Sequence, residues 1–551
     1  MKCAQTLIAG DQNQVIADIL GNILSGFSGK DGLLQFQQGV PYEGVRSAGV
    51  VLDALFGLQS GNTDFNPFPK CTLEFVMRIA VVVLLAASSL SASARSTHDP
   101  RLAGGYKANQ GGWTYVHLAG TPEQIGFQHG YLLAKEIDDN VHVYAVEAPN
   151  LDQKDWSFFR EAARTILWPH LEPEYQAELK GIAAGLKAAG SKTDLWDVVA
   201  INGNEELTGY YLPMLNAQQQ KPNPPAAAAP GKCSAFIATG SATKDGKIVI
   251  AHSNWSSYAE GERWTVVFDI VPAKGYHILM DGAPGFITSQ DDFGVNAAGL
   301  MITETTLPMA AGFDVNGIAE FERSRKAMQY ASSIDEYAEI MRKGNNGGYA
   351  NSWMIGDRKT NEIAYLELGL KHTPLKRKKD GYFVSANYAW DPDVIRDDTP
   401  GFDPKNMSSS MNARHVTAEA FVQKHYGQLD TALAEAYLSD HYDSYEKKVD
   451  AGKRSLCGHE ELSAEGEPVW GNPPFSPSGA VTGKVMDADM AANMSFIARA
   501  GHPCGEDFIA APFLEKHSEF AWQKPILHDM KAGPWTTFSA GEFAPSTVAQ
   551  R

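Results

Sequence analysis

Residues 233–255 read CSAFIATGSATKDGKIVIAHSNW, and this stretch carries the clearest structural signal in the chain. Two runs of alternating apolar residues, 234–240 and 247–252, flank a turn that contains Asp245 and Gly246. Alternation with a period of two on both sides of an Asp-Gly turn predicts an antiparallel β-hairpin. Cys233 therefore stands at the opening of the first strand.

The segment before this hairpin has a very different composition. Residues 218–232 read QQQKPNPPAAAAPGK, a Pro- and Ala-rich tract that cannot build a core. A flexible tract that leads into a Cys at the start of a strand is typical of N-terminal-nucleophile hydrolase precursors, which are cut before that Cys. A Cys on a strand is more often a small buried hydrophobe. The catalytic interpretation of Cys233 therefore depends on its surroundings.

Composition limits the class of protein. A hydrophobic content of 44% with 20% charged residues is that of an ordinary globular chain. The net charge of −18 argues against a nucleic-acid partner, because phosphate binding needs clustered basic residues. The one basic run, KRKK at residues 376–379, precedes Asp380 and Gly381 and is predicted to form a solvated hairpin turn.

The N-terminal region has the sequence pattern of a secretion signal. Residues 77–94 combine Met77 and Arg78, a short apolar run and the small-residue sequence SASA, which together predict a signal peptide. The apolar run is too short to span a bilayer. We therefore expect a secreted or periplasmic protein, lysosomal in a eukaryote, and treat residues 1–76 as a doubtful extension. The alternative is a genuine extension in which the apolar run is a core segment.

The predicted export changes how the five cysteines are interpreted. Cys3 and Cys71 precede the expected mature start, which leaves three cysteines in an oxidising compartment. Cys457 and Cys504 both lie in the Pro- and Gly-rich C-terminal part, so we expect them to form a disulfide. Cys233 then remains as the thiol that a nucleophile requires.

The order of predicted elements indicates an α+β fold. Residues 95–215 are largely helical, 216–232 form a flexible processing linker, and 233–551 form the nucleophile-bearing domain. One helix is expected over 124–143, with Thr121 as its N-cap. Hairpins separated by helices favour antiparallel sheets covered by helices, arranged as a four-layer αββα sandwich.

An N-terminal Cys can act without a distant triad. Its thiolate is the nucleophile, and its own α-amine can serve as the base. The reaction also needs donors directed at the developing oxyanion, for which Asn387 at a strand end is a candidate. Positive charge near the thiolate would come from His252 or Arg414. His129, on a helix face, is predicted to be structural, and Gly126 and Gly130 suit close packing.

Several segments, taken in order, resemble the phospholipase B-like (lamina-ancestor) family. They are CSAF at 233–236, HSNW at 252–255, TSQDDF at 288–293, GLMITETT at 299–306, NSWM at 351–354, SAN at 385–387 and NARH at 412–415. The resemblance spans about residues 110–540. It implies the N-terminal-nucleophile αββα fold, cleavage before the Cys, and hydrolysis of amide or ester bonds in lipids.

The resemblance also implies roles for individual residues. Cys233 matches the nucleophile, His252 the catalytic histidine, Asn387 the oxyanion asparagine and Arg414 the arginine that orients the site. The expected substrate-binding residues are Trp255, Thr305 and Thr306. No cofactor and no metal are expected, because the histidines are scattered and His425 and His441 form no HExxH-like pair.

Other interpretations stay open at this point. Gly126–Gly130, residues 180–182 and LCGH at 456–459 also resemble penicillin acyltransferases, which are more distant relatives together with the choloylglycine hydrolases. An acyltransferase or amidase of that type is therefore one alternative. A non-catalytic secreted lipid-binding protein is another. The expected partner is an acylated small molecule or lipid, and peripheral contact with membrane lipid, the acyl donor and the oligomeric state are left open.

Overall fold

A computed structural model describes residues 99–221, 232–289 and 293–544, which belong to a single unit of the chain. The predicted signal peptide at 77–94 and the extension at 1–76 lie outside the described residues. Residues 222–231, most of the predicted processing linker, also lie outside them. None of the helices in the described part has the length and apolar character needed to cross a membrane.

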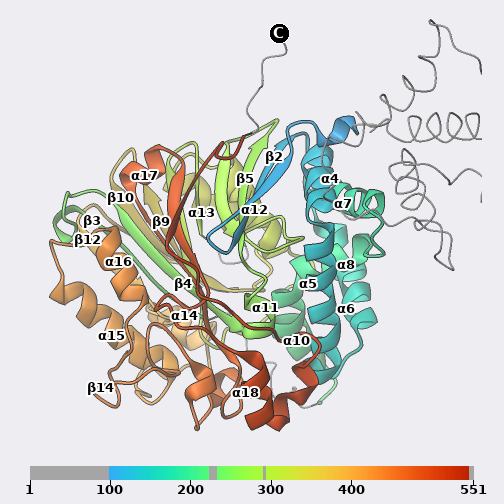
Figure 1. The fold of residues 1–551 in the computed structure, drawn as a ribbon. Coiled ribbons are helices and arrows are strands. Elements are labelled where there is room, and N and C mark those ends of the chain that lie inside the picture. The colour runs from blue at the N-terminus through green and yellow to red at the C-terminus, as the bar shows by residue number, and fades with distance from the viewer. Residues whose placement is uncertain (1–98, 222–231, 290–292, 545–551) are drawn as a thin grey trace, which may run out of the picture. The chain divides into compact units, whose positions relative to one another are not determined.

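Two β-sheets form the centre of this unit (Figure 1). The first has nine strands, in the spatial order β1 (Tyr106–Gln110), β2 (Trp113–Gly120), β5 (Val266–Pro272), β6 (Ile278–Gly282), β7 (Gly294–Asn296), β8 (Leu300–Thr306), β9 (Asn351–Asp357), β10 (Glu362–Leu368) and β11 (Leu375–Lys378). The second has six, in the order β12 (Gly381–Ser385), β3 (Lys232–Thr239), β4 (Val249–Ser257), β15 (Ser478–Asp487), β16 (Ser495–Ala500) and β17 (Thr536–Ser539). Neighbouring strands run antiparallel except β2 and β5. A separate pair joins β13 (Tyr442–Asp443) and β14 (Lys448–Val449).

Helices cover both outer faces. The helices that share an apolar core with the nine-stranded sheet are α4 (Pro122–Leu132), α5 (Ala134–Glu147), α6 (Trp156–Ala162), α7 (Pro173–Ala188), α8 (Leu195–Asn202), α12 (Glu320–Tyr330) and α13 (Ile334–Arg342). Those on the six-stranded sheet are α15 (Ser410–Lys424) and α16 (Thr431–Leu438). The short helices are α9 (Asn204–Glu206), α10 (Leu212–Gln218), α11 (Tyr258–Gly261), α14 (Pro392–Asp397), α17 (Ala488–Ala492) and α18 (Ala510–Lys516). π-Helical turns span Ala148–Asp152, Ala163–Leu167 and Leu207–Tyr211.

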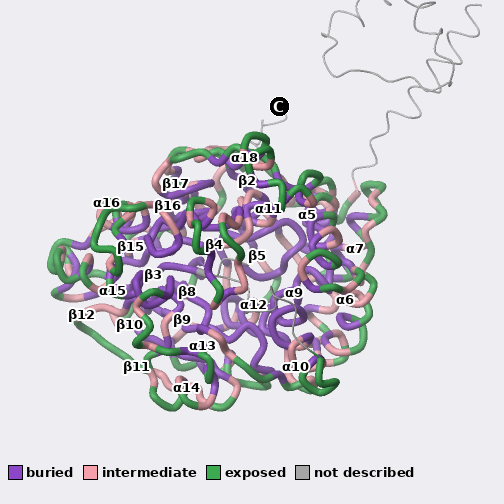
Figure 2. The backbone as a smooth tube through the Cα atoms, turned by 90° about the horizontal axis from the view of Figure 1, so that it is seen from below, coloured by how far each residue is buried: buried purple, intermediate pink, exposed green. Residues whose placement is uncertain are grey.

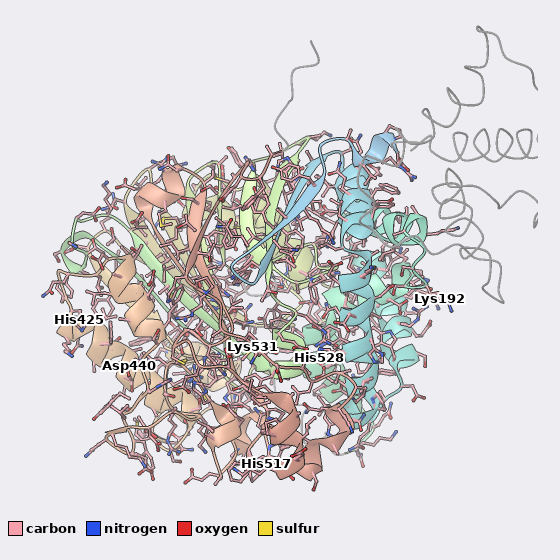
Figure 3. All side chains as sticks on the ribbon, in the orientation of Figure 1. Lys192, His425, Asp440, His517, His528 and Lys531 are labelled. Carbon is pink, nitrogen blue, oxygen red and sulfur yellow. The ribbon has the colours of Figure 1, made fainter. Side chains whose placement is uncertain are left out.

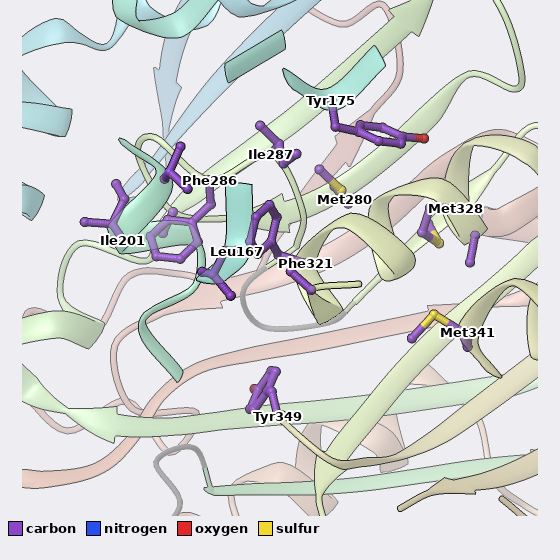
Figure 4. Close-up of a cluster of buried hydrophobic side chains, with 14 of the residues drawn as sticks. Leu167, Tyr175, Ile201, Met280, Phe286, Ile287, Phe321, Met328, Met341 and Tyr349 are labelled. Carbon is purple, nitrogen blue, oxygen red and sulfur yellow. The ribbon is translucent and has the colours of Figure 1, made fainter. Parts of the chain in front are cut away.

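Three apolar cores separate these layers. The core between the sheets joins Ile237 and Ile250 of the six-stranded sheet to Val267 and Met354 of the other. The largest core lies between the nine-stranded sheet and its helices, and Figure 4 shows part of it, from Leu167 to Tyr349. A third core lies under α15 and α16. In Figure 2 the central strands are buried, whereas outer elements such as β11 are exposed. The predicted αββα sandwich is confirmed.

The predicted hairpin at Cys233 is also present. In the pairing of β3 with β4, Cys233 lies opposite Asn254, and Ala235 lies opposite His252. The connection contains a 3-10 turn, Gly240–Ala242, and a left-handed Gly246 at φ +78°. The second strand extends beyond the predicted run to Ser257, so His252 lies in the middle of a strand.

The basic run at 376–379 differs from its prediction. Most of the run lies in β11 and not in a turn. This strand is at the edge of the sheet, and its Arg377 pairs with Ala364 of β10. Arg377 also forms a 2.9 Å ion pair with Glu362. Exposed charges on an edge strand discourage pairing with other chains. The turn that follows leads into β12 of the other sheet rather than into a hairpin partner.

The helix predicted over 124–143 is divided at Leu133. Thr121 caps α4 as expected, but Leu133 has a non-helical backbone (φ −111°, ψ 22°) and separates α4 from α5. The two halves have different partners, because α4 packs on α7 whereas α5 contacts α8 and α11. A single straight helix could not make both sets of contacts.

Glycines allow α4 and α7 to approach very closely. A Cβ atom at Gly126 would lie 2.0 Å from the carbonyl oxygen of Glu178, and one at Gly130 would lie 2.0 Å from that of Ile182. Gly181 and Gly185 of α7 face α4 in the same way. Because the obstacles are backbone atoms, no side-chain rotation can make room for a methyl group.

Replacing one of these glycines should therefore separate the two helices. We expect Gly130→Ala to lower the free energy of unfolding by about 1–3 kcal/mol, the usual cost of overpacking, despite the better helix propensity of alanine. Denaturant unfolding followed by circular dichroism measures this change. Lys187→Ala, on the exposed side of α7, is the matched control and should change stability by less than about 0.5 kcal/mol. Equal stabilities of the two variants would contradict the close-contact interpretation.

Candidate active site

Cys233 is buried, and each part of the residue has a polar neighbour. Its backbone N–H donates to Oδ1 of Asn387 at 2.8 Å, and its carbonyl oxygen accepts from Nη1 of Arg414 at 2.5 Å. Its Sγ lies 3.5 Å from Oδ1 of Asn254 and 3.7 Å from Oε1 of Glu304. The first strand of the hairpin thus brings the thiol to a polar point between the two sheets.

Asn387 follows β12 and has a left-handed backbone, with φ +61°. That conformation is uncommon for a residue other than glycine, and it recurs at functional sites. The side-chain oxygen accepts from Cys233 and from Nη2 of Arg414 at 2.9 Å. The amide nitrogen donates to the carbonyl oxygen of Thr306 at 3.0 Å. One amide hydrogen therefore remains available for an oxyanion.

Arg414 of α15 is fully buried and ties several elements together. Besides Cys233 and Asn387, its donors reach Oγ of Ser410 at 2.9 Å and Oγ of Ser234 at 3.1 Å. Its guanidinium carbon lies 4.2 Å from the ring centroid of Trp255, a cation–π contact. Burial lowers the pKa of Arg414 to about 10, so the side chain still carries its charge at neutral pH.

His252 lies on the same strand as Asn254 and is fully buried. Neither ring nitrogen has a hydrogen-bond partner among the described residues. Burial and the nearby ammonium of Lys484 lower the pKa of His252 well below its ordinary value. The imidazole is therefore neutral near pH 7, and of the two cations considered from the sequence only Arg414 supplies charge. One ring nitrogen of His252, Sγ of Cys233 and an oxygen of Glu304 lie within 4.8 Å of one another.

The three expected substrate-binding residues differ in how closely they approach this centre. The indole ring of Trp255 contacts the guanidinium of Arg414 and not Cys233 itself. Thr306 contacts Asn387 through its carbonyl oxygen, and its Oγ1 is buried without a hydrogen-bond partner in the described chain. Thr305 Oγ1 lies 2.5 Å from Oγ of Ser385, on the strand that leads to Asn387. Thr306 is thus in direct contact with the site, and Thr305 acts through Ser385.

Sequence reasoning did not assign a role to Asn254 or Glu304. Asn254 could have been found from the hairpin register, because it lies directly opposite Cys233. Glu304 belongs to β8 of the other sheet, and its approach to Cys233 depends on how the sheets stack. His129, in contrast, lies in a core: its Nε2 accepts from the N–H of Gly285 at 3.0 Å, and burial lowers its pKa to about 3.

The disulfide expected between Cys457 and Cys504 requires a correction. The two residues are neighbours in space, but both sulfurs are free thiols. His459 contacts both, with Nε2 3.7 Å from Sγ of Cys457 and 3.5 Å from Sγ of Cys504. The two cysteines are close together, as expected, but the expected disulfide between them is not present.

A group of buried acids lies just beyond the end of β4. Ser256 donates to Glu260 at 2.8 Å, and Ser257 donates to Glu147 at 3.3 Å. Burial and the neighbouring carboxyl of Glu260 raise the pKa of Glu147 and of Glu205, and raise that of Asp152 to about 7. These carboxyls favour their protonated forms, because burial penalises the charge.

Residues 135–367 match the family model described as Phospholipase B. Curated relatives include phospholipase B-like 1 of Homo sapiens, 23% identical over 42% of this chain and 47% of that protein. Phospholipase B of Crotalus adamanteus is 24% identical over 50% of this chain and 52% of that protein. The predicted resemblance to the phospholipase B-like family is confirmed.

The extent of these matches is limited. The chain spans about half the length of the phospholipase B-like relatives named above, and 44% of an uncharacterized Archaeoglobus fulgidus protein that is 26% identical over 48% of this chain. The range matched by the family model contains Cys233 and His252 and ends before Asn387 and Arg414. Among solved structures, the conjugated bile acid hydrolase from Clostridium perfringens aligns with 48% of this chain and 89% of its own, with a TM-score of 0.29 and 12% identity.

The buried acids should make stability depend on pH. Asp152 has a pKa near 7 in the folded chain but about 4 when unfolded, so the folded state binds the proton more tightly. Its contribution to stability is therefore present below about pH 4 and is lost as the pH rises through about 7. We expect the free energy of unfolding of Asp152→Asn, measured relative to wild type, to increase between about pH 4.5 and about pH 8. The exposed Asp155→Asn is the control, and a parallel pH response of all three proteins would contradict the assignment.

Proposed function

We propose that the protein is an autoprocessed hydrolase that cleaves amide or ester bonds of acylated, lipid-like substrates through an N-terminal Cys233. The observation that carries the proposal is the surroundings of Cys233. Its nitrogen contacts Asn387, its carbonyl oxygen contacts a buried cation, and its thiol faces Asn254 and Glu304. Any buried backbone N–H and carbonyl oxygen needs a partner. Here both partners are side chains, Asn387 and Arg414, and the thiol itself has polar neighbours, which a cysteine that served only as packing would not need.

Processing begins with attack of Sγ on the carbonyl carbon of Lys232. The C–N bond between Lys232 and Cys233 breaks, a thioester forms, and the nitrogen of Cys233 becomes a free amine. Water then hydrolyses the thioester, which leaves a carboxylate on Lys232 and the thiol on Cys233. The hydrogen bond to Asn387 is made by the same nitrogen before and after cleavage, so the new amine starts in position.

Catalysis then uses the amine as a base. It accepts the Sγ proton as the thiolate attacks the acyl carbonyl, and it returns the proton to the leaving group. The charge of Arg414 favours the negative species that develop nearby. The free amide hydrogen of Asn387 is the proposed donor to the oxyanion. Water releases the acyl group from Cys233 in the second half of the reaction.

The two fragments should remain associated after the cut. Strands β1 and β2 of the N-terminal fragment belong to the nine-stranded sheet, where β2 pairs with β5. Helices α4 to α8 share the largest apolar core with the strands of the C-terminal fragment. Separation would expose this core to water.

The proposed substrate class follows from the relatives and from one cavity. The names of the curated relatives include phospholipase B, which supports acyl lipids as substrates. An apolar cavity of about 350 Å³ includes residues 309–312, which follow Thr306 along the chain, together with Met214 and Trp470. An acyl chain fits such a lining. Export through the signal at 77–94 completes the proposal.

The processing step is tested with Cys233→Ala. We expect wild type to yield two fragments that copurify, the larger one starting at Cys233, and Cys233→Ala to yield one folded, uncut chain without activity. A denaturing gel with N-terminal sequencing measures this. Turnover is followed with a diacyl phospholipid and with an N-acyl amide of the same acyl chain.

The variant Cys233→Ser tests the nucleophile while changing only one atom of the side chain. Its hydroxyl is the weaker nucleophile, so slow cutting and weak turnover are expected. The conservative variant also keeps a polar group beside Asn254. Fully active wild-type enzyme that runs as one uncut chain would overturn the N-terminal-nucleophile proposal.

The role of Asn387 is tested with Asn387→Gly. Glycine tolerates the positive φ, so the variant removes the side chain without adding backbone strain. We expect turnover to fall by about 10²–10³, the usual loss for one oxyanion donor. The free energy of unfolding should also fall, by about 1–3 kcal/mol, because the N–H of Cys233 and Nη2 of Arg414 lose their buried acceptor. Asn387→Asp retains an acceptor for the amine but has no amide hydrogen, so it should lose turnover as well. Turnover close to wild type in Asn387→Asp would limit this residue to positioning the amine.

A further inference from the structure

Four metal-binding side chains meet outside the proposed active site. They are His441, Cys457, His459 and Cys504, and one potential ligand atom from each lies within 4.8 Å of all the others. They come from three separate segments: the residues after α16, the segment before a 3-10 turn at Glu460–Leu462, and the residues after β16. The four residues form a Cys2His2 set of ligands. No single sequence motif contains all of them, because they come from separate segments.

The distances fit a tetrahedral metal centre. A zinc ion has ideal bond lengths of about 2.3 Å to sulfur and about 2.0–2.1 Å to nitrogen, which in a tetrahedron separate these ligands by about 3.5 Å. Nε2 of His459 lies 3.7 Å from Sγ of Cys457 and 3.5 Å from Sγ of Cys504. These two distances are close to the spacing that coordination requires, and the remaining pairs of ligand atoms lie within 4.8 Å of one another.

Hydrogen bonds orient His459 for this role. Its Nδ1 lies 3.1 Å from Oε1 of Glu461, and the hydroxyl of Tyr258 donates to the other oxygen of that carboxylate. A proton held on Nδ1 by a carboxylate leaves the lone pair of Nε2 directed at the two sulfurs. This carboxylate–histidine arrangement is the usual support of a zinc-bound imidazole.

The backbone around the ligands is tied together as well. The N–H of Cys457 donates to the carbonyl oxygen of Asp440, the residue before His441, at 3.0 Å. Oγ of Ser439 donates to the carbonyl oxygen of Pro503, the residue before Cys504, at 2.9 Å. His441 itself has a buried Nε2 without a hydrogen-bond partner among the described residues. These hydrogen bonds fix the positions of the segments relative to one another. Nε2 of His441 is then available as a metal ligand.

We propose that His441, Cys457, His459 and Cys504 bind one zinc ion. Two thiolates and two neutral imidazoles balance its charge, so binding releases two protons from the two thiols. Sulfur and imidazole ligands in a tetrahedral arrangement favour zinc over the hard cations, which prefer oxygen. A disulfide between the two cysteines would not explain why two histidines lie beside them.

The site would act as a structural support for the catalytic region. Gly458 lies between two of the ligands and directly against the ring of Trp255, where a Cβ atom would be 2.0 Å from the ring. Trp255 in turn supports Arg414. All four positions are occupied by protein ligands, which is the pattern of a structural rather than a catalytic zinc site.

The test is the metal content of the full chain purified without added chelator. We expect about one zinc per chain in wild type by inductively coupled plasma mass spectrometry. After removal of the zinc, cobalt(II) should produce the thiolate charge-transfer and visible bands of a tetrahedral cobalt site. These measurements need no substitution, so they do not depend on the folding of a variant.

Variants assign the ligands. Cys504→Ser and His441→Ala should each lose the bound zinc and the cobalt bands. His425→Ala, a histidine labelled in Figure 3 that is not part of the cluster, should retain both. Cys233→Ala should also retain the metal, which separates this proposal from the catalytic one.

Three outcomes would overturn the proposal. One is the absence of stoichiometric metal from wild type. Another is a Cys457–Cys504 disulfide, found by peptide mapping without reductant in protein that contains no zinc. A third is stoichiometric iron or copper in place of zinc.

Discussion

The buried guanidinium of Arg414 is the interaction on which the site depends. It is a full charge in an interior where its partners are neutral oxygens: a backbone carbonyl, two serine hydroxyls and an amide. A buried cation is tolerated only when its donors are satisfied, so each of these oxygens must stay in place. Because the oxygens belong to β3, α15 and the end of β12, one side chain fixes the relative positions of three elements.

This arrangement has an electrostatic consequence for Cys233. No carboxylate forms an ion pair with Arg414 within the described residues, although the charges of Glu460 and Glu467 act on it. The guanidinium can therefore still stabilise a negative group that forms beside it. His252 cannot share that role, because burial and Lys484 keep its imidazole neutral. Glu304 opposes Arg414, since an ionised carboxylate 3.7 Å from Sγ would disfavour the thiolate. The nucleophile is therefore best formed when its proton has a nearby acceptor, as an N-terminal amine would provide.

How far the sequence predicts this structure depends on the range of the interactions. The hairpin at Cys233 and the N-cap at Thr121 were predictable because a short stretch of sequence specifies each one. The break at Leu133 and the edge strand at Arg377 were not, because each depends on a partner element that is distant in sequence. The local sequence pattern predicts that a helix or strand is present. Where that helix or strand ends, and what it packs against, depends on tertiary contacts.

The same distinction applies to the site residues. Cys233 and Asn387 stand beside strands that the sequence pattern reveals, so their candidacy was visible. Glu304 was not, because only the stacking of the two sheets brings β8 against β3. The histidines appeared scattered for the same reason: His441 and His459 meet only when their segments are joined through backbone hydrogen bonds.

The C-terminal region thus has a physical connection to the nucleophile. The ring of Trp255 lies against Gly458 and also contacts the guanidinium of Arg414. A shift of the segment at Gly458 toward the ring would displace Trp255, and the displacement would reach Arg414 through the cation–π contact. Arg414 would then pull on the carbonyl oxygen of Cys233, the residue that must be aligned to within a fraction of an ångström for attack. Rigidity around Cys457 and His459 is therefore a requirement of the geometry at Cys233, although the two regions are more than two hundred residues apart in sequence.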